Sequence, residues 1–356
     1  MTARKIKIGE RWVGAGEPCY IVAEVSANHN QSFERALEII KAAKSAGADA
    51  VKLQTYTPDT MTMKSDLEWF QVPRDSLWAG KTLYQLYQEA YTPWDWHAGL
   101  QRTAHQLGLD FFSTPFDATA VAFLEGLNVP AYKVASFELI DLSLLRVVAK
   151  TGKPVIVSTG MASLAEIEEG VTTLRANGAQ QIALLKCTSA YPARPSEMNL
   201  RTIPDLAARF DTVVGLSDHT LGGNTAITAV ALGASVIEKH FILARADGGP
   251  DSTFSMEPEE FAEMVKGVRE AEQALGEVSY KRSQEETNSV CFRRSLFVVQ
   301  DVKAGEKFTG KNVRVIRPGY GLPPRYWGDV VGRNSARDVP QGTPLSWDLI
   351  AGKAEE

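Results

Sequence analysis

Two lysines and two histidines stand where they could do chemistry together. Lys52 lies in the run DAVKLQTY and Lys133 in AYKVASF. His219 ends TVVGLSDH, and His240 stands in the next such run, SVIEKHF. Two ammonium groups at one site can bind a small polyanion such as a phosphate or carboxylate. Two imidazoles on neighbouring strands suit a divalent metal with open positions, and two ordinary hydrogen-bonded histidines are the alternative.

Eight short runs rich in β-branched residues, between Cys19 and Phe241, predict the elements that position these side chains. The segments between them have apolar residues at helical spacing and often end at glycine. Eight strand–helix units in roughly 250 residues favour a parallel (β/α)8 TIM barrel over a doubly wound sheet. Its active site is expected at the carboxyl ends of the strands. The polar residues that end the runs are Glu24, Ser26, Lys52, Gln54, Ser113, Thr114, Lys133, Ser136, Ser158, Thr159, Ser189, Tyr191, Ser217, Asp218, His219, Glu238 and His240.

The change in composition along the chain predicts where its domains divide. We expect the barrel over residues 1–275, a polar linker over 276–289, and a small domain of short strands over 290–356. The small domain has room for only a modest core of its own. A further irregular region, the insertion at residues 58–93, is expected to act as a lid or binding loop because it is long and aromatic. Its aromatic residues include Trp69, Phe70, Trp78, Tyr84, Tyr87 and Tyr91.

Composition excludes several classes of protein. The 356 residues include 38 basic and 43 acidic side chains, a formal charge of −5, so no basic footprint for nucleic acid is present. No apolar run approaches the ~20 residues that span a bilayer, and the start MTARKIKIGE lacks the apolar core of a signal peptide. Three scattered cysteines do not make a disulfide framework. We therefore expect a cytoplasmic globular protein with no membrane or nucleic-acid partner.

Other polar residues carry weaker signals. His97 and His105 lie in a helical stretch and are expected at the surface, whereas His29 could orient a loop or touch substrate. Asp251, in the GGPDS loop after the eighth run, is placed to be a third metal ligand or a substrate contact. Lys186 could form a Schiff base with a carbonyl substrate, but strand alternation predicts that it points outward.

The motifs taken together resemble one family along nearly the whole chain. The strings AEVSANHN, GADAVKLQTYTPDT, FFSTPFD, YKVASFE, STGMA, KCTSAYP, GLSDHT, EKHF, GGPDSTFS, RRSL and RPGYGLPP follow one another as in the sialic acid synthase family. Relatives that make N-acetylneuraminate usually have Asn where Ser189 stands. With the aromatic insertion, this resembles the branch whose acceptor sugar is 2,4-diacetamido-2,4,6-trideoxy-L-altrose, and legionaminic or N-acetylneuraminic acid synthesis is the alternative.

The resemblance implies a TIM barrel followed by a C-terminal antifreeze-like (SAF) domain that caps the sugar, in a domain-swapped homodimer. The implied reaction joins phosphoenolpyruvate to the open-chain aldehyde of an acetamido sugar, releasing phosphate and giving a nine-carbon 2-keto acid. The implied cofactor is a divalent metal ion, manganese above all, with magnesium or cobalt possible. A phosphoenolpyruvate-dependent synthase acting on a sugar phosphate and a non-catalytic carbohydrate-binding barrel are the rival interpretations.

The resemblance also implies a role for individual residues. It makes His219 and His240 the metal ligands, and Glu24 or Glu238 the group that assists the water or the proton transfers. The residues implied for phosphoenolpyruvate are Lys52, Thr114, Lys133, Ser136, Ser189 and Ser217. The residues implied for the sugar are Gln54, Glu138, Tyr191 and Asp251, with Arg317 contributed by the neighbouring subunit.

Overall fold

The chain folds around a closed barrel of eight parallel strands. The computed structural model describes residues 4–74 and 76–352, which form two compact units that divide between Gly276 and Glu277. In the first unit the strand order around the barrel is β10-β3-β4-β5-β6-β7-β8-β9, which confirms the predicted TIM barrel. All eight predicted runs form its strands, namely β3 (Tyr20–Glu24), β4 (Ala50–Thr55), β5 (Asp110–Pro115), β6 (Tyr132–Val134), β7 (Val155–Ser158), β8 (Ile182–Cys187), β9 (Val213–Asp218) and β10 (Val236–His240).

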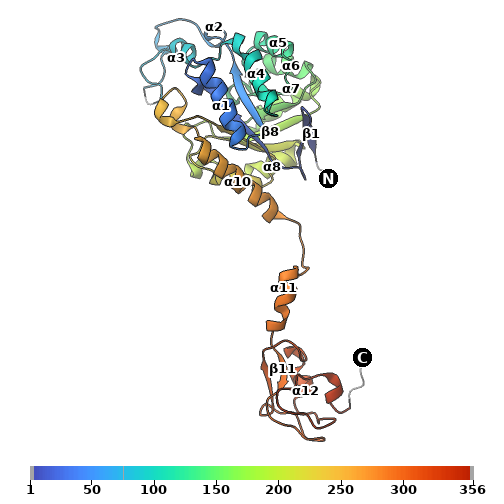
Figure 1. The fold of residues 1–356 in the computed structure, drawn as a ribbon. Coiled ribbons are helices and arrows are strands. Elements are labelled where there is room, and N and C mark those ends of the chain that lie inside the picture. Colours follow the sequence, from blue (N-terminus) through green and yellow to red (C-terminus); the bar gives the residue numbers. More distant parts are fainter. Residues whose placement is uncertain (1–3, 75, 353–356) are drawn as a thin grey trace. The chain divides into compact units, whose positions relative to one another are not determined.

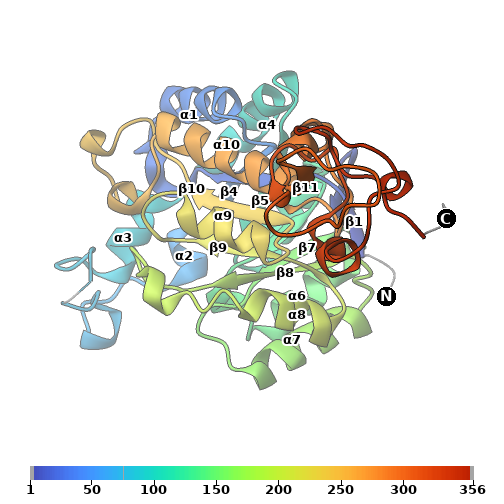
Figure 2. The same ribbon diagram turned by 90° about the horizontal axis from the view of Figure 1, so that it is seen from below.

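Helices surround the barrel and cover its outer face (Figure 2). The strands are buried on both faces, which explains why their sequences are almost continuously apolar outside the site. The last helix has Pro258 in its first turn, where the missing amide hydrogen costs nothing. The surrounding helices are α1 (Phe33–Ser45), α4 (His97–Gln106), α5 (Ala118–Gly126), α6 (Leu142–Lys150), α7 (Leu164–Ala176), α8 (Thr202–Phe210), α9 (Asn224–Ala231) and α10 (Pro258–Leu275).

The two ends of the barrel carry different elements. The insertion, with α2 (Pro58–Met61) and α3 (Leu83–Ala90), lies at the same end as the loop that follows β10 (Figure 1). The opposite end carries an antiparallel hairpin of β1 (Lys5–Ile8) and β2 (Arg11–Gly14), which the sequence analysis did not predict. The insertion therefore covers the carboxyl ends of the strands, where a barrel places its site.

The second unit has a small core of its own. Strand β11 (Ser295–Val298) pairs antiparallel with β12 (Val313–Ile316), and helix α12 (Trp327–Val330) follows. The segment expected to be a plain linker contains a short helix, α11 (Gln284–Asn288), which begins at a capping box formed by Ser283 and Glu286. The residues that form this core are Leu296, Val298, Val302, Phe308, Val313, Val330, Val339, Leu345, Leu349 and Ile350.

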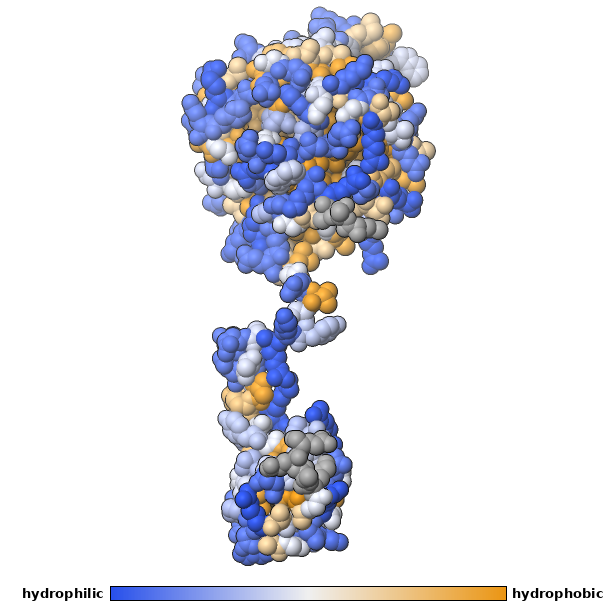
Figure 3. All heavy atoms as spheres, turned by 90° about the vertical axis from the view of Figure 1, so that its right-hand side faces the viewer, coloured by the Kyte–Doolittle hydropathy of each residue, from blue (hydrophilic) through white to orange (hydrophobic). Residues whose placement is uncertain are grey.

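The surface of the chain mixes polar and apolar residues. Hydrophilic side chains are spread over the face shown in Figure 3, with apolar side chains between them. Within residues 4–74 and 76–352, no helix combines the length and the apolar character needed to cross a membrane.

Candidate active site

Strand alternation sorts the polar residues at the strand ends into two sets. On β4, the side chains of Lys52 and Gln54 face the barrel interior. Thr55 instead bonds to the hydroxyl of Ser113 at 2.6 Å and to the imidazole of His97, on the outer helix α4, at 2.8 Å. Alternate residues of a strand point to opposite faces, so one polar residue of each neighbouring pair serves the site and the other serves the packing of the helices.

Asp218 follows the same rule on β9. It forms a buried ion pair with Lys239, at 2.7 Å between the carboxylate and the ammonium group. Lys239 also donates hydrogen bonds to the carbonyls of Thr220 and Gly222, so this pair fastens the turn after β9. Asp218 therefore belongs to the structural set, although it stands next to His219 in the sequence.

Four charged side chains form the floor of the site inside the barrel. Lys52 Nζ lies 3.1 Å from Glu24 Oε2 and 3.0 Å from Glu238 Oε1. Lys133 Nζ lies 3.6 Å from the same oxygen of Glu238. All four residues are at most 5% exposed. The two ammonium groups and two carboxyl groups balance in formal charge, so the floor is net cationic in the form with Glu24 protonated, which burial favours.

Neutral side chains complete the floor. Lys133 donates a hydrogen bond of 2.7 Å to the Ser158 hydroxyl, and the Ser217 hydroxyl donates one of 3.0 Å to Glu238. The side-chain amide of Gln54 donates to Glu24 at 3.0 Å. These bonds fix the rotamers of the charged groups, as a preorganised site requires.

The environment shifts the pKa values of the two carboxyl groups of the floor in opposite directions. Burial raises the pKa of Glu24 and outweighs the nearby ammonium group of Lys52. Burial acts on Glu238 in the same direction, but the charges of Lys133 and Lys52 overcome it and lower the pKa of Glu238 to about 2. Burial also lowers the pKa of Lys133. A pair of carboxyl groups separated in this way can supply an acid and a carboxylate at the same pH.

The two histidines meet at the barrel rim on adjacent strands. The ring centroids of His219 and His240 are 5.4 Å apart. His219 Nδ1 donates to the Thr188 carbonyl at 3.0 Å, which leaves Nε2 as the nitrogen that a neutral ring would offer to a metal ion. His240 Nδ1 is buried and has no hydrogen-bond partner, and Asp251 Oδ2 lies 3.8 Å from it. Burial lowers the pKa of His240 well below its usual range, so its ring is neutral.

These rings fit a divalent metal ion. The ring of His219 is fixed by its hydrogen bond, and the ring of His240 is neutral. The unpartnered nitrogen of His240 is the buried atom that a bound metal ion would satisfy. Across the described ranges 4–74 and 76–352, no group of three or more His, Cys, Asp and Glu side chains is placed to hold a metal. Asp251, expected above as a third metal ligand or a substrate contact, is therefore not part of such a group.

A cavity of about 400 Å³ opens above the floor. The insertion contributes one wall, in agreement with its interpretation as a binding loop, although Trp69 of the same segment points away and is 84% exposed. Gln54, Glu138, Tyr191 and Asp251, predicted to face the sugar, all line this cavity. The other lining residues are Ser26, Tyr56, Met61, Trp78, Leu86, Tyr87, Ala90, Phe116, Ala135, Phe137, His240 and Pro250.

Several serine and threonine hydroxyl groups lie in the barrel interior together with the charged floor. The Ser136 hydroxyl accepts a hydrogen bond of 3.0 Å from the Gly160 amide. A Cβ atom at Gly160 would stand 2.3 Å from the Ser189 hydroxyl and 2.7 Å from that of Ser136, so both hydroxyls converge on this glycine. Thr114 Oγ1 is buried without a partner. The structure thus brings Ser136 and Ser189, both predicted to hold phosphoenolpyruvate, together at Gly160.

The prediction for His97 is wrong. It is fully buried on α4 and bonds to Thr55, because its helix packs this face against the barrel. His105 is exposed, as expected. His29 is buried and bonds to the Thr92 hydroxyl at 3.1 Å, so it orients the loop after β3 and does not line the cavity. Lys186 donates to the Cys187 carbonyl at 2.7 Å and likewise does not line the cavity.

Some residues of the site carried no functional prediction. Cys187 Sγ lies 3.9 Å from His219 Nδ1, and this contact, with the charge of His219, overcomes burial and lowers the thiol pKa to about 7. Tyr56 and Phe116 form an aromatic contact in the cavity wall. Tyr56 could have been found from strand alternation, since it follows Gln54 by two residues. Arg317 follows β12 in the second unit, and its contact with a sugar stays a prediction.

The barrel and the small second unit agree with what sequence comparison shows. The NeuB family matches residues 39–280, and the SAF domain matches residues 293–351. The chain belongs to the NeuB family and carries a SAF domain at its C-terminal side. The family resemblance drawn from the motifs is thereby confirmed.

The comparisons also narrow the branch of the family. The pseudaminic acid synthase of Helicobacter pylori is 43% identical over 335 residues, covering 94% of this chain and 98% of that one. The N,N'-diacetyllegionaminic acid synthase of Legionella pneumophila is 35% identical, covering 95% and 96%. Among solved structures, the N-acetylneuraminic acid synthetase of Leptospira borgpetersenii, in complex with citrate, aligns with a TM-score of 0.72 at 29% identity, covering 81% and 95%.

Proposed function

We propose that this chain is a pseudaminic acid synthase. It condenses phosphoenolpyruvate with 2,4-diacetamido-2,4,6-trideoxy-L-altrose and releases phosphate. The 43% identity to the Helicobacter pylori enzyme over nearly the whole chain supports this choice of branch. The observation that carries the proposed chemistry is the site itself: two buried lysines share one carboxylate, and the nearby cavity is lined by His240, whose ring lies 5.4 Å from that of His219.

The reaction forms one carbon–carbon bond and breaks the link to phosphate. The methylene carbon of phosphoenolpyruvate attacks the aldehyde carbon of the open-chain sugar, and the aldehyde oxygen takes up a proton. The attack leaves C2 as a cation still bonded to the phosphate oxygen; water adds there with loss of a proton, and departure of phosphate from the resulting tetrahedral carbon leaves the 2-keto acid. Two reactants must be held in register for the attack, which is the main contribution a rigid barrel mouth can make.

The cationic floor is proposed to bind phosphoenolpyruvate. Lys52 and Lys133 neutralise its negative charge, and charge-assisted hydrogen bonds to buried ammonium groups are strong. The hydroxyls of Ser136 and Ser189, which converge on Gly160, suit the oxygens of a phosphate or carboxylate. Thr114 and Ser217 are proposed to complete the set. A hydroxyl at Ser189 reaches less far than the carboxamide of the relatives that make N-acetylneuraminate.

Glu24 and Glu238 are proposed to divide the proton chemistry. The raised pKa of Glu24 favours its protonated form and suits a proton donor. Glu238, held ionised by Lys133 and Lys52, suits the stabilisation of the positive charge that develops at C2 before water adds.

His219 and His240 are proposed to hold the divalent ion, with manganese as the ion used and magnesium or cobalt as substitutes. When bound there, a divalent ion acts as a Lewis acid that polarises the sugar carbonyl. The Thr188 carbonyl fixes the ring of His219 for this task, and Asp251 lies close enough to His240 to orient it or to contact substrate.

The cavity is proposed to receive the acetamido sugar. Gln54, Glu138 and Asp251 offer polar groups to its hydroxyls and amides. Met61 and Leu86, from the insertion, offer apolar surface that suits a deoxy carbon and acetyl methyl groups. No lysine or arginine among the described residues lines this cavity, which fits an acceptor without a phosphate group.

The assembly follows the family resemblance. We propose a homodimer in which Arg317 of the second unit serves the sugar pocket of the neighbouring subunit. The use of phosphoenolpyruvate, a metabolite of the cell interior, supports a cytoplasmic location.

An acceptor panel tests the proposed function. Phosphate release and product mass are measured with phosphoenolpyruvate and N-acetylmannosamine, the diacetamido altrose, or its diacetamido mannose counterpart. We expect kcat/KM for the altrose to exceed that for the others by about 100-fold or more. Preference for the mannose counterpart or for N-acetylmannosamine would assign the chain to the legionaminic or N-acetylneuraminic branch. No turnover with any acceptor would refute the synthase proposal.

A further inference from the structure

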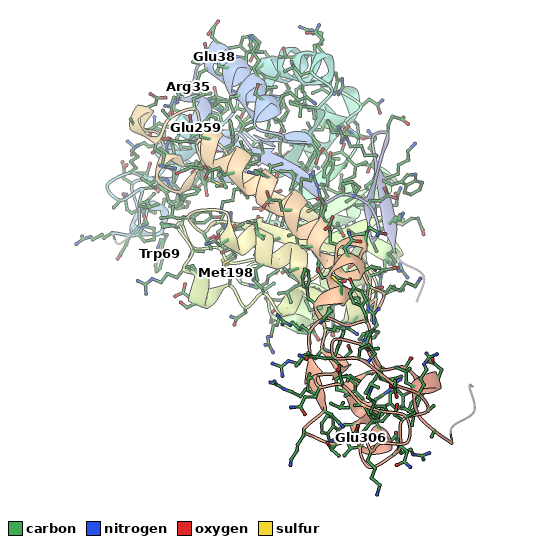
Figure 4. All side chains as sticks on the ribbon, turned by 60° about the horizontal axis from the view of Figure 1, so that its bottom comes forward. Arg35, Glu38, Trp69, Met198, Glu259 and Glu306 are labelled. Atoms are coloured by element: carbon green, nitrogen blue, oxygen red, sulfur yellow. The ribbon has the colours of Figure 1, made fainter. Side chains whose placement is uncertain are left out.

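The insertion places one tryptophan in the cavity wall and another at the outer surface. Trp78 lines the cavity and is only partly exposed. Trp69, nine residues earlier, is 84% exposed and lies at the periphery of the first unit (Figure 4). Trp78 is surrounded by other residues of the cavity, whereas Trp69 is exposed to solvent. Trp78 is therefore the residue to test, and Trp69 is its control.

The ring of Trp78 is fixed in place. Its indole N–H donates a hydrogen bond of 2.7 Å to the carbonyl of Pro250. Pro250 precedes Asp251, whose carboxylate accepts from the Ser26 hydroxyl and lies 3.8 Å from His240 Nδ1. Trp78 therefore ties the insertion to the loop that carries a site residue, and its ring has little freedom to turn away from the cavity.

Trp78 is also one end of a row of aromatic rings. Its ring centroid lies 5.9 Å from that of Tyr191, with a tilt of 57° between the planes. The Tyr191 ring in turn lies 4.4 Å from the ring of His219. The row, here called the aromatic wall, thus runs from the histidine pair through Tyr191 to Trp78 in the insertion.

The wall has the chemistry of a sugar-binding surface. Aromatic faces carry partial negative charge, and the C–H groups of a sugar ring or acetyl methyl carry partial positive charge, so the two pack well together. Polar groups of Ser26, Gln54 and Glu138 line the same cavity and can take the hydroxyl and amide edges. Apolar faces combined with a few placed polar groups are the usual means of orienting a small ligand.

We propose that Trp78 is a specificity-determining residue that packs its indole face against the acceptor sugar. The inference rests on the proposed function and deepens it, since it assigns to the insertion a direct contact with the acceptor. Trp78 touches the acceptor and not phosphoenolpyruvate, whose proposed ligands lie in the floor of the barrel. If Trp78 only fastened the insertion, its substitution would instead weaken the binding of both substrates or lower the stability alone.

Three variants separate these roles. Trp78→Leu removes the aromatic face and the N–H, Trp78→Phe keeps an aromatic face without the N–H, and Trp69→Leu is the matched control. We expect Trp78→Leu to raise the KM of the acceptor at least 10-fold with the KM of phosphoenolpyruvate changed less than 2-fold. Trp78→Phe should recover most of that loss, and Trp69→Leu should match wild type.

Binding calorimetry with the diacetamido altrose alone, and separately with phosphoenolpyruvate alone, gives the same answer without turnover. An unchanged acceptor affinity in Trp78→Leu, or an equal loss for both substrates, overturns the proposal. If Trp78→Leu does not fold, Trp78→Phe decides: a weakening of less than 10-fold that is confined to the acceptor supports the proposal, and an equal loss for both substrates overturns it. Wild type that binds the sugar without releasing phosphate refutes the proposed function but leaves this contact testable.

Discussion

At the scale of single residues, the site shows groups that folding alone does not explain. A buried ion pair is weak evidence for stability because desolvation offsets most of its attraction. Glu138 Oε2, His240 Nδ1 and Thr114 Oγ1 are buried without hydrogen-bond partners, a state that costs free energy. Such groups concentrate where a ligand completes them. The polar interior is therefore best understood as a receptor whose partners are substrates.

Replacing Lys52 by methionine tests the floor. The change leaves Glu24 without its ammonium partner and Glu238 with Lys133 alone, so we expect kcat/KM to fall by about 100-fold or more. The free energy of unfolding should fall by about 3 kcal/mol. Phosphate release and urea denaturation measure the two effects. The control Lys81→Met removes an exposed pair with Glu89 and should cost under about 1 kcal/mol with normal turnover. Full activity in Lys52→Met would contradict the assignment.

Glu138 gives the stability of the protein a pH dependence. Burial raises its pKa to about 7, whereas the unfolded chain has the usual value near 4.5. Between these values the folded state binds the extra proton, so the contribution of Glu138 is present at low pH and is lost as pH rises through 7. We expect wild type to lose at most about 3 kcal/mol more than Glu138→Gln between pH 4 and pH 8, by urea denaturation. Equal losses in both proteins would contradict this.

At the scale of elements, β9 carries a tight packing constraint next to the site. Gly215 lies within this strand, and a Cβ there would stand 2.3 Å from the Val236 carbonyl oxygen and 2.6 Å from Leu185. Because β9 also carries Ser217 and leads to His219, a displacement would move the site. We expect Gly215→Ala to cost about 2–3 kcal/mol of stability and to lower kcat.

The control for this change is Gly126→Ala, at the end of α5, where an added Cβ meets nothing within 4 Å. This variant should be neutral or slightly stabilising because alanine favours helix. Thermal melts and phosphate release measure both variants. Equal stability in the two variants would show that β9 tolerates the added carbon.

The sequence predicted the eight strands because each is a compact β-branched run, and it predicted His219 and His240 together because their strands are consecutive. It did not predict the β1–β2 hairpin, whose strands are four residues long and partly polar. It misplaced His97, because the partner that buries this ring, Thr55, is 42 residues away. Contacts between distant loops, such as Trp78 with Pro250, leave no local pattern to read.

At the scale of the whole molecule, the proposal assigns parts of one site to two chains. If Arg317 serves the neighbouring subunit, Arg317→Ala and Lys52→Met damage different halves of each site. A mixed dimer then contains one site with both halves intact. We expect refolding the two variants together to restore about a quarter of wild-type turnover, a statistical share for random pairing.

Refolding Arg317→Ala with wild type is the control, because it measures how far inactive subunits lower turnover when no complementation is possible. Sedimentation gives the oligomeric state. Turnover no greater than the sum of the separate variants would contradict the shared site. It would mean that Arg317 does not contribute to the active site of the neighbouring subunit. A monomer in sedimentation would rule out the shared site altogether.

The most direct test of the central claim is the reaction of the purified chain before and after removal of metal. Phosphoenolpyruvate and the diacetamido altrose are supplied at saturation, and phosphate and the nine-carbon acid are measured together. The account predicts that the chain stripped by chelation and dialysis makes no product and that added manganese restores the rate. Carbon–carbon bond formation at the full rate by the ion-free chain would contradict it.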